Sequence, residues 1–304
     1  MTAYEVLVIG GGPAGLSASL YLARYNRRVG LFDAGQGRST WHQTAHNYLG
    51  FPGGIPTRQL RELGYQQLRE YQQVEINNHK VESLEQANGG FIARGQAGEW
   101  FGQAVILCTG VVDHYPHFDD WHEYVGRSMF WCITCDGYAC TGNRVVVLGN
   151  TKQAASEAMQ LQRFSPDITV LTDSHDYAIP PKFEARLKAA NIPIIHDKIA
   201  KVQGSNGQLE MIHTMSGAAI PCDQIFSQQG ATPQNKLALD LGIKVSASGY
   251  IETDVEQQTS VPGVYAAGDV TRLFAHQIST AVHEGGQAAS AANYYLYPPE
   301  LKDD

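Results

Sequence analysis

Two cysteines separated by two residues, Cys132 and Cys135, are the side chains of this chain best suited to chemistry. A CxxC pair can close a small disulfide, and a thiolate in such a motif has a lowered pKa and attacks other disulfides readily. The carboxylate of Asp136 follows directly and can carry the proton that thiol–disulfide exchange must move. The motif therefore predicts a redox-active disulfide with Asp136 as its acid and base.

Zinc binding and a purely structural disulfide are the alternative interpretations of this pair. Half of a zinc site has the same spacing, but the chain has no second CxxC, and Cys140 with His114, His117 and His122 fits no common zinc pattern. Five cysteines, an odd number, favour a reducing compartment, where structural disulfides are rare. We expect no metal, and we expect Cys108 to be a buried small apolar residue.

The composition predicts a globular protein without affinity for polyanions. The chain has 304 residues, 43% hydrophobic and 17% charged, which is enough for two domains with cores of their own. A net charge of −8 without a basic tract argues against nucleic acid and anionic membrane surfaces as partners. We find no apolar run of membrane-spanning length and no signal peptide, and we expect a cytoplasmic location.

A glycine-rich turn near the N-terminus has the context of a dinucleotide-binding fingerprint. The stretch 4–10 predicts a buried strand and 16–24 predicts a helix, with a GxGxxG turn between them. In such a turn Gly10 allows the tight bend, Gly12 lets the backbone approach a pyrophosphate, and Gly15 permits close packing of helix on strand. The alternative is a glycine-rich turn without a ligand.

Asp33 completes this fingerprint because it follows a second predicted strand, 28–32, and a carboxylate there can accept hydrogen bonds from a ribose hydroxyl. A similar unit appears later as a strand over 145–148, a glycine turn, a helix over 154–163 and a strand over 168–171. This repetition predicts two nucleotide-type α/β domains.

Four motifs in one order resemble the low-molecular-weight thioredoxin reductase family of flavoproteins, and the resemblance spans essentially the whole chain. The motifs are GGGPAG at 10–15, CTG at 108–110, CITCDG at 132–137 and AAGDV at 266–270. The resemblance implies an α/β fold of two Rossmann-like, three-layer ββα nucleotide-binding domains, the second inserted into the first. It implies an FAD-binding domain of residues 1–112 and 232–304, and a central domain of residues 113–231 that carries the CxxC.

The same resemblance implies the functional residues and the partners. Cys132 and Cys135 would be the redox pair and Asp136 the acid/base. The residues that would hold FAD are Gly10, Gly12, Pro13, Ala14, Gly15, Asp33, Asn47, Val81, Thr109, Gly110, Gly268, Asp269, His276, Gln277 and Ile278. The segment 41–43 departs from the usual flavin loop, so His42 and His46 are either ligands or surface histidines. A homodimer and a thioredoxin-like or other dithiol/disulfide protein, or a small thiol, are the implied partners.

The central domain departs from the reductases where they bind NADPH. Thr151 replaces the second glycine of the expected GxGxxA at 149–154, and the segment 172–175, with Asp173, stands where the family has a His-Arg-Arg cluster. A 2′-phosphate needs cations. Two missing charge-assisted hydrogen bonds, each worth roughly 1.5–3 kcal/mol, would weaken binding on the order of 10²–10⁴-fold. The alternatives are NADH with Asp173 on its ribose, no nicotinamide cofactor, and weak retained NADPH binding. We favour the second.

Nicotinamide-independent members of the wider family include ferredoxin-linked thioredoxin reductases, dithiol oxidases and cyanobacterial diflavin-linked disulfide oxidoreductases, and the chain looks most like the last two. In the diflavin proteins a second FAD occupies the place vacated by NADPH. We expect an FAD-dependent thiol/disulfide oxidoreductase that works without NADPH. We also expect it to oxidise dithiols and to bind a second FAD in the vacated NADPH site. The alternatives are an NAD(P)H- or ferredoxin-dependent thioredoxin reductase and, in another class, a non-catalytic flavin redox sensor.

Overall fold

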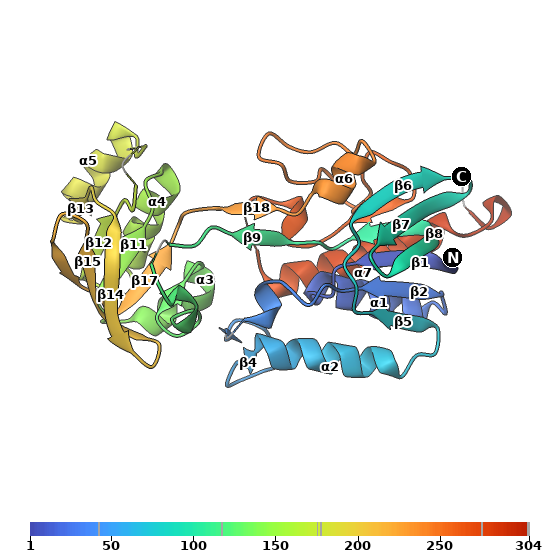
Figure 1. The fold of residues 1–304 in the computed structure, drawn as a ribbon, viewed down its shortest axis with the longest axis horizontal. Helices are drawn as coiled ribbons and strands as arrows, with labels where there is room; N and C mark the ends of the chain where they lie inside the picture. Colours follow the sequence, from blue (N-terminus) through green and yellow to red (C-terminus); the bar gives the residue numbers. More distant parts are fainter. Residues whose placement is uncertain (42, 117, 175, 177, 275, 303–304) are drawn as a thin grey trace. The chain divides into compact units, whose positions relative to one another are not determined.

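The computed structural model describes residues 1–41, 43–116, 118–174, 176, 178–274 and 276–302 (Figure 1). It divides into two compact units. The first contains Met1–Thr40, Thr57–Val112 and Thr232–Asp304, and the second contains Trp41–Pro56 and Asp113–Ala231. The chain passes between them within two paired strands, β9 (Val111–Asp113) and β18 (Ala231–Pro233).

The first unit is built on a seven-stranded mixed sheet with a path order of β5-β2-β1-β8-β7-β6, and β19 pairs with β8. The strands β1, β2, β5, β8 and β19 are parallel, and β6, β7 and β8 form an antiparallel meander. Their bounds are β1 Thr2–Ile9, β2 Val29–Phe32, β5 Val74–Asn77, β6 Ser83–Ala87, β7 Gly90–Gly95, β8 Gly98–Leu107 and β19 Val264–Ala266. The helices of this unit are α1 Pro13–Arg24, α2 Thr57–Arg69, α6 Lys236–Asp240 and α7 Ile278–Tyr295.

The side chains of the central strand β1 point alternately into two hydrophobic cores, one on each face of this sheet. Val6 and Val8 belong to a cluster with side chains of α1 and α7, whereas Leu7 and Ile9 belong to a second cluster with the meander and α6. Because successive side chains of a strand point to opposite faces, the part of a strand that is covered on both sides must be apolar, as the buried run Val6–Ile9 is.

The second unit repeats this plan with a parallel sheet of order β10-β17-β11-β12-β13. Its strands are β10 Met129–Phe130, β11 Val145–Leu148, β12 Ile168–Leu171, β13 Ile194–Ile195 and β17 Gln224–Ser227. Its helices are α3 Ile133–Asp136, α4 Lys152–Leu161 and α5 Pro181–Ala189. A three-stranded antiparallel meander accompanies them, β14 Ile199–Ser205, β15 Gln208–Thr214 and β16 Ala219–Pro221, and a short ladder pairs β3 Thr44–Ala45 with β4 Ile55–Pro56.

The predicted α/β class, with a Rossmann-like sheet in each unit, is confirmed. The expected domain bounds remain a proposal. Contacts group residues 41–56 with the second unit, where the Trp41 ring lies 5.5 Å from that of Trp131 and 5.4 Å from that of Tyr115. In the described part of the chain, no helix combines the length and the apolar character that crossing a membrane requires.

Candidate redox and nucleotide sites

The redox motif forms the disulfide that the sequence predicts. Cys132 and Cys135 are joined, with their Cα atoms 5.3 Å apart. Cys132 is the N-cap of α3, and its carbonyl accepts hydrogen bonds from the amides of Cys135 at 3.2 Å and Asp136 at 3.0 Å. The Cys135 amide also lies 3.2 Å from Sγ of Cys132, so a thiolate formed there has a hydrogen-bond donor at hand.

Two carboxyl groups with raised pKa values lie in this loop and on helix α4, which packs against it. Burial raises the pKa of the Asp136 carboxyl to about 7, which is near the value that suits an acid/base at neutral pH. The second is Glu157 on α4, which the sequence analysis missed. Its Oε1 accepts the Ile133 amide at 3.1 Å, and burial raises its pKa to about 7 as well. An acid among Ala154, Ala158 and the other apolar residues of this helix face was the available signal.

The other three cysteines are buried, and burial raises the pKa of each thiol: Cys108 and Cys222 to about 12, and Cys140 to about 11. The prediction that Cys108 is buried is confirmed. Thiols of such high pKa are poor nucleophiles at neutral pH. No group of three or more described metal-binding side chains is close enough to hold a metal ion, and His117 lies outside the described residues.

The first glycine loop has the local geometry of a nucleotide cradle. Gly10 has φ +118°, and a Cβ there would collide with the carbonyl oxygen of Cys108. A Cβ at Gly15 would collide with the carbonyl of Gly10, whereas nothing lies within 4 Å of a Cβ at Gly12. Gly12 is the extended N-cap of α1, and Pro13 is its first residue. Tight packing at two glycines and open space at the helix start fit an FAD pyrophosphate.

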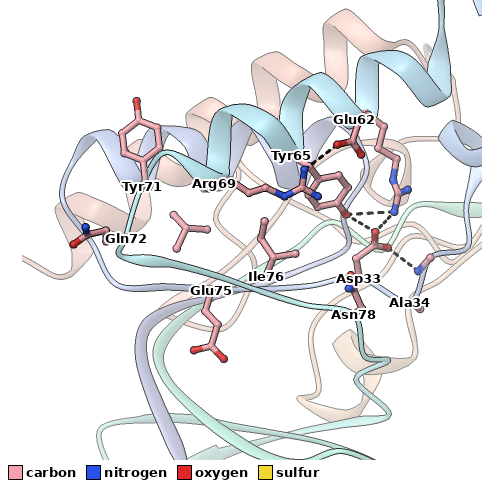
Figure 2. Close-up of a pocket in the computed structure, with 13 residues that line it drawn as sticks. Asp33, Ala34, Glu62, Tyr65, Arg69, Tyr71, Gln72, Glu75, Ile76 and Asn78 are labelled. Atoms are coloured by element: carbon pink, nitrogen blue, oxygen red, sulfur yellow. Dashed lines mark hydrogen bonds and ion pairs between the residues drawn. The ribbon is translucent and has the colours of Figure 1, made fainter.

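Asp33 follows β2 at the mouth of a cavity of about 760 Å³ between α2 and β5. Its Oδ1 accepts the Gly35 amide at 3.0 Å, and its Oδ2 accepts from the Arg61 guanidinium and the Tyr65 hydroxyl. Figure 2 shows Asp33 and Tyr65 turned toward each other. Arg61 also donates to the carbonyl of Gly11 at 3.2 Å. Asp33, the predicted ribose acceptor, is therefore held by two side chains of α2 that the sequence analysis did not assign.

The C-terminal motif lies against the first loop, since a Cβ at Gly268 would be 3.0 Å from Cβ of Ala14. Arg38 Nη1 lies 2.8 Å from Oδ2 of Asp269 and 2.9 Å from Nδ1 of His276. The His276 Nε2 is 2.7 Å from the carbonyl of Arg272. Both ring nitrogens of His276 therefore lie within hydrogen-bond distance of protein partners, which hold the ring in place.

Buried Glu284 of α7 supports this motif. Its carboxylate accepts the Gly268 amide at 2.7 Å and pairs with Arg272. Gln277 is the N-cap of α7, so Ile278 is the first residue of that helix. Gly268, Asp269, His276 and Gln277 are thus close in the chain and in space, whereas Glu284, a turn and a half into the helix, was not expected.

The remaining predicted contacts lie in both units. Thr109 Oγ1 donates to the carbonyl of Gln234 at 2.6 Å, and the carbonyl of Gly110 accepts the Gln234 amide at 2.9 Å. Val81 is buried in the first unit. Asn47 belongs to the second unit, where its amide nitrogen lies 3.4 Å from the carbonyl of Thr134. His46, also in the second unit, lies against Gly54, and His42 is outside the described residues.

The loop of the expected NADPH site has only part of a nucleotide cradle. Gly149 has φ +146°, and a Cβ there would lie 2.7 Å from the carbonyl oxygen of Gln228, so this glycine is required. Thr151 is the N-cap of α4. Asp173 has φ +47°, and its Oδ1 accepts the Ile199 amide at 3.0 Å while Oδ2 accepts from Gln229 Nε2 at 2.7 Å. Both oxygens of this carboxylate hold protein partners. His175 lies outside the described residues.

The fold and the disulfide define a class of protein. Residues 4–288 match the family model of pyridine nucleotide-disulphide oxidoreductases, and the chain belongs to this family. The thioredoxin reductase of Rickettsia typhi is 30% identical over 96% of this chain and 98% of its own length. The solved thioredoxin reductase of Streptococcus pyogenes is 26% identical over 97% of this chain and 98% of its own, with a TM-score of 0.90. An atypical thioredoxin reductase of Desulfovibrio vulgaris is 33% identical over 96% and 97%, with a TM-score of 0.54.

The family-level prediction is confirmed: the chain is a thioredoxin reductase-like, flavin-dependent disulfide oxidoreductase. Cys132 and Cys135, the predicted redox pair, are present as a disulfide.

Proposed function

We propose that the chain exchanges electrons between a partner dithiol, the Cys132–Cys135 disulfide and FAD, and that it does not use NADPH as its donor. In the dithiol-oxidising direction, the partner loses two electrons and two protons and becomes a disulfide. The Cys132–Cys135 bond breaks, and the pair becomes a dithiol. When the pair closes again, two electrons and one proton would pass to FAD, and the other proton would leave through Asp136 and solvent.

FAD is held by residues of the first unit in this proposal. It supplies a two-electron acceptor when bound. The glycine loop at Gly12 receives the pyrophosphate, and Asp33 receives the adenosine ribose. Asp269, Gln277 and the other residues implied by the resemblance hold the remainder. The open space at Gly12 and the close approach of Gly268 to Ala14 support this assignment.

The negative charge of Asp173 is the observation that argues against NADPH as the electron donor. A 2′-phosphate requires cations at the end of β12, and this chain places an anion there. Asp173 also accepts hydrogen bonds through both oxygens, from the Ile199 amide and from Gln229, which makes it an anchor of its own loop. Thr151 adds a Cβ where the backbone of a nucleotide loop must be bare.

We further propose that the protein oxidises dithiols and that a second FAD binds in the vacated NADPH site. Tyr138 is 86% exposed in the second unit and offers a free aromatic face for stacking. The Trp131 ring is packed among those of Trp41 and Tyr115, so it serves the core of this unit instead. Electrons taken from the dithiol would leave through the second flavin, a protein acceptor or oxygen.

An NADPH-dependent thioredoxin reductase is the second candidate, because the relatives named above are thioredoxin reductases. In either case we propose a thioredoxin-like protein, another dithiol or disulfide protein, or a small thiol as the partner, and a homodimer as the assembly. A flavin redox sensor without turnover would share the cofactor but would not process many dithiols per flavin.

An anaerobic titration distinguishes these functions. The purified protein receives stoichiometric NADPH, then NADH, then dithiothreitol, while flavin absorbance near its visible maximum is followed. We expect bleaching only with the dithiol, and we expect Cys135→Ser to remove that bleaching while FAD stays bound. Bleaching by stoichiometric NADPH would make the chain an ordinary thioredoxin reductase. Counting FAD per chain then tests the second flavin.

A further inference from the structure

Glu157 is a buried carboxyl that the exchange reaction described above does not use. It belongs to α4, but its Oε1 accepts the main-chain amide of Ile133, the residue directly after Cys132, at 3.1 Å. The side chains that share its face of α4 are apolar: Ala154, Ala158 and Leu161 lie in the core of the second unit. An acid in such a place is costly unless it has a specific partner, and its hydrogen-bond donor is the backbone of the redox loop.

The charged groups around Glu157 leave its charge uncompensated. The elements packed against α4 are α3, α5, β11 and β12. β11 and β12 carry no titratable side chain, and α3 contributes Asp136, another acid. The charged residues of α5 are exposed: Lys182, Glu184, Arg186 and Lys188. Within the described ranges Glu157 forms no ion pair, so a negative charge there acts on the neighbouring cysteine with little opposition.

We propose that Glu157 is a positioning residue of the redox disulfide: it holds the Ile133 amide while Cys132 changes partners, and its charge restrains thiolate formation in the reduced pair. This inference rests on one part of the proposed function, the redox activity of Cys132 and Cys135. It does not depend on the identity of the electron donor or on a second flavin.

The expected effect has a definite sign. Burial raises the pKa of Glu157 to about 7, so the group is mostly neutral below that pH and charged above it. A nearby negative charge disfavours a thiolate and raises the pKa of the thiol. The influence of Glu157 on the reduced cysteines is therefore small at pH 6 and large at pH 8.

Alkylation of the dithiothreitol-reduced holoenzyme with iodoacetamide measures this influence, because only the thiolate reacts. Glu157→Gln keeps an oxygen acceptor for the Ile133 amide and removes the charge. We expect it to lower the pKa of the more reactive thiol by about one unit and to accelerate alkylation at pH 8 several-fold, with little change at pH 6. Glu184→Gln, the same change on exposed α5, is the control and should match wild type. Equal thiol pKa values in wild type and Glu157→Gln would overturn the proposal.

The dithiol–disulfide equilibrium gives a second readout that a merely structural residue would not move. Against a dithiothreitol redox buffer at pH 8, Glu157→Gln should shift the equilibrium constant up to about tenfold toward the dithiol, since a stabilised thiolate favours the reduced form. An unchanged constant would overturn the proposal. A wild-type pair that never becomes alkylated after reduction would instead refute the redox function itself.

Two further proteins keep the test decisive if Glu157→Gln does not fold. Asp136→Asn removes the other carboxyl of high pKa, so a second inflection near pH 7 in its alkylation profile, in addition to that of the thiol itself, belongs to Glu157. A profile without that inflection would contradict the proposal. Glu157→Leu removes the acceptor, and deuterium exchange of the peptide with Ile133 should become faster than in wild type or Glu157→Gln. Unchanged exchange would refute the positioning role.

Discussion

Arg61 forms an ion pair with Asp33 and thereby ties α2 to the end of β2. The same guanidinium reaches the carbonyl of Gly11 at 3.2 Å and lies over the Tyr65 ring, 5.0 Å from its centroid. One side chain thus contacts both the glycine loop and Asp33, the proposed ribose acceptor of the first unit. Asp33 is buried, so this ion pair lies largely away from solvent.

Replacement of Arg61 by Met should weaken FAD binding and destabilise the first unit. Without Arg61 the carboxylate of Asp33 keeps only the Gly35 amide and the Tyr65 hydroxyl as donors, and the loss of a hydrogen bond to a charged group costs about 1.5–3 kcal/mol. We expect loss of FAD on gel filtration and a melting temperature several degrees lower. Arg69→Met is the matched control, because Arg69 pairs with Glu62 in an exposed position, where such pairs are worth about 0–1 kcal/mol. Equal FAD retention in the two variants would contradict this role of Arg61.

Cys135→Ser should abolish dithiol turnover and leave FAD bound, since a serine cannot close the disulfide with Cys132. The measurement is dithiol oxidation per flavin, together with the flavin content of the purified protein. Cys222→Ala, at a buried thiol remote in sequence from the pair, should retain turnover. Turnover that survives in Cys135→Ser would disprove the assignment of the redox pair.

The stability of the protein should fall as the pH rises from about 4 toward 7. Burial raises the folded-state pKa of Asp136 and of Glu157 above the ordinary values of 3.8 and 4.5 to about 7. In that window the folded protein binds more protons than the unfolded chain, so stability is greatest below the ordinary pKa and is lost through the raised one. Melting temperatures across this range should decline less in Asp136→Asn than in wild type. Parallel pH profiles of the two proteins would refute the burial of a titrating Asp136.

Asp173→Asn should lower the melting temperature and leave any weak response to NADH unchanged. The Asn side chain has one acceptor oxygen, so either the Ile199 amide or the Gln229 amide loses its partner, at a cost of about 1–3 kcal/mol. Asp167→Asn, an exposed change in the same unit, is the control. If Asp173→Asn altered the response to NADH without affecting stability, Asp173 would be a ribose ligand rather than a loop anchor.

Short-range patterns predicted the fold and the redox pair because they depend on neighbours in the chain. The CxxC at Cys132 and the glycine turn at Gly10 encode local geometry, and alternating apolar runs encode the strands. The partners of these motifs lie far away in sequence: Arg61 for Asp33, Glu157 for Ile133 and Gln229 for Asp173. Spacing carries no information about such tertiary contacts.

For the segment 41–56, the sequence could not predict which of the two units it packs into. Contacts group it with the second unit because Trp41 joins the aromatic cluster around Trp131. An isolated Trp in a polar loop gives no sequence signal about which core it enters. Asn47, expected among the FAD contacts, lies in this same segment.

Helix α4 begins at the altered nucleotide loop and carries, less than two turns later, the carboxylate that holds the loop of the disulfide. A substitution that changes the start of this helix therefore also displaces Glu157 and the loop of Cys132 that it holds. Mutations that change what the loop at Gly149 can bind would therefore also change the support of the cysteine pair, so the two sites of this unit would vary together.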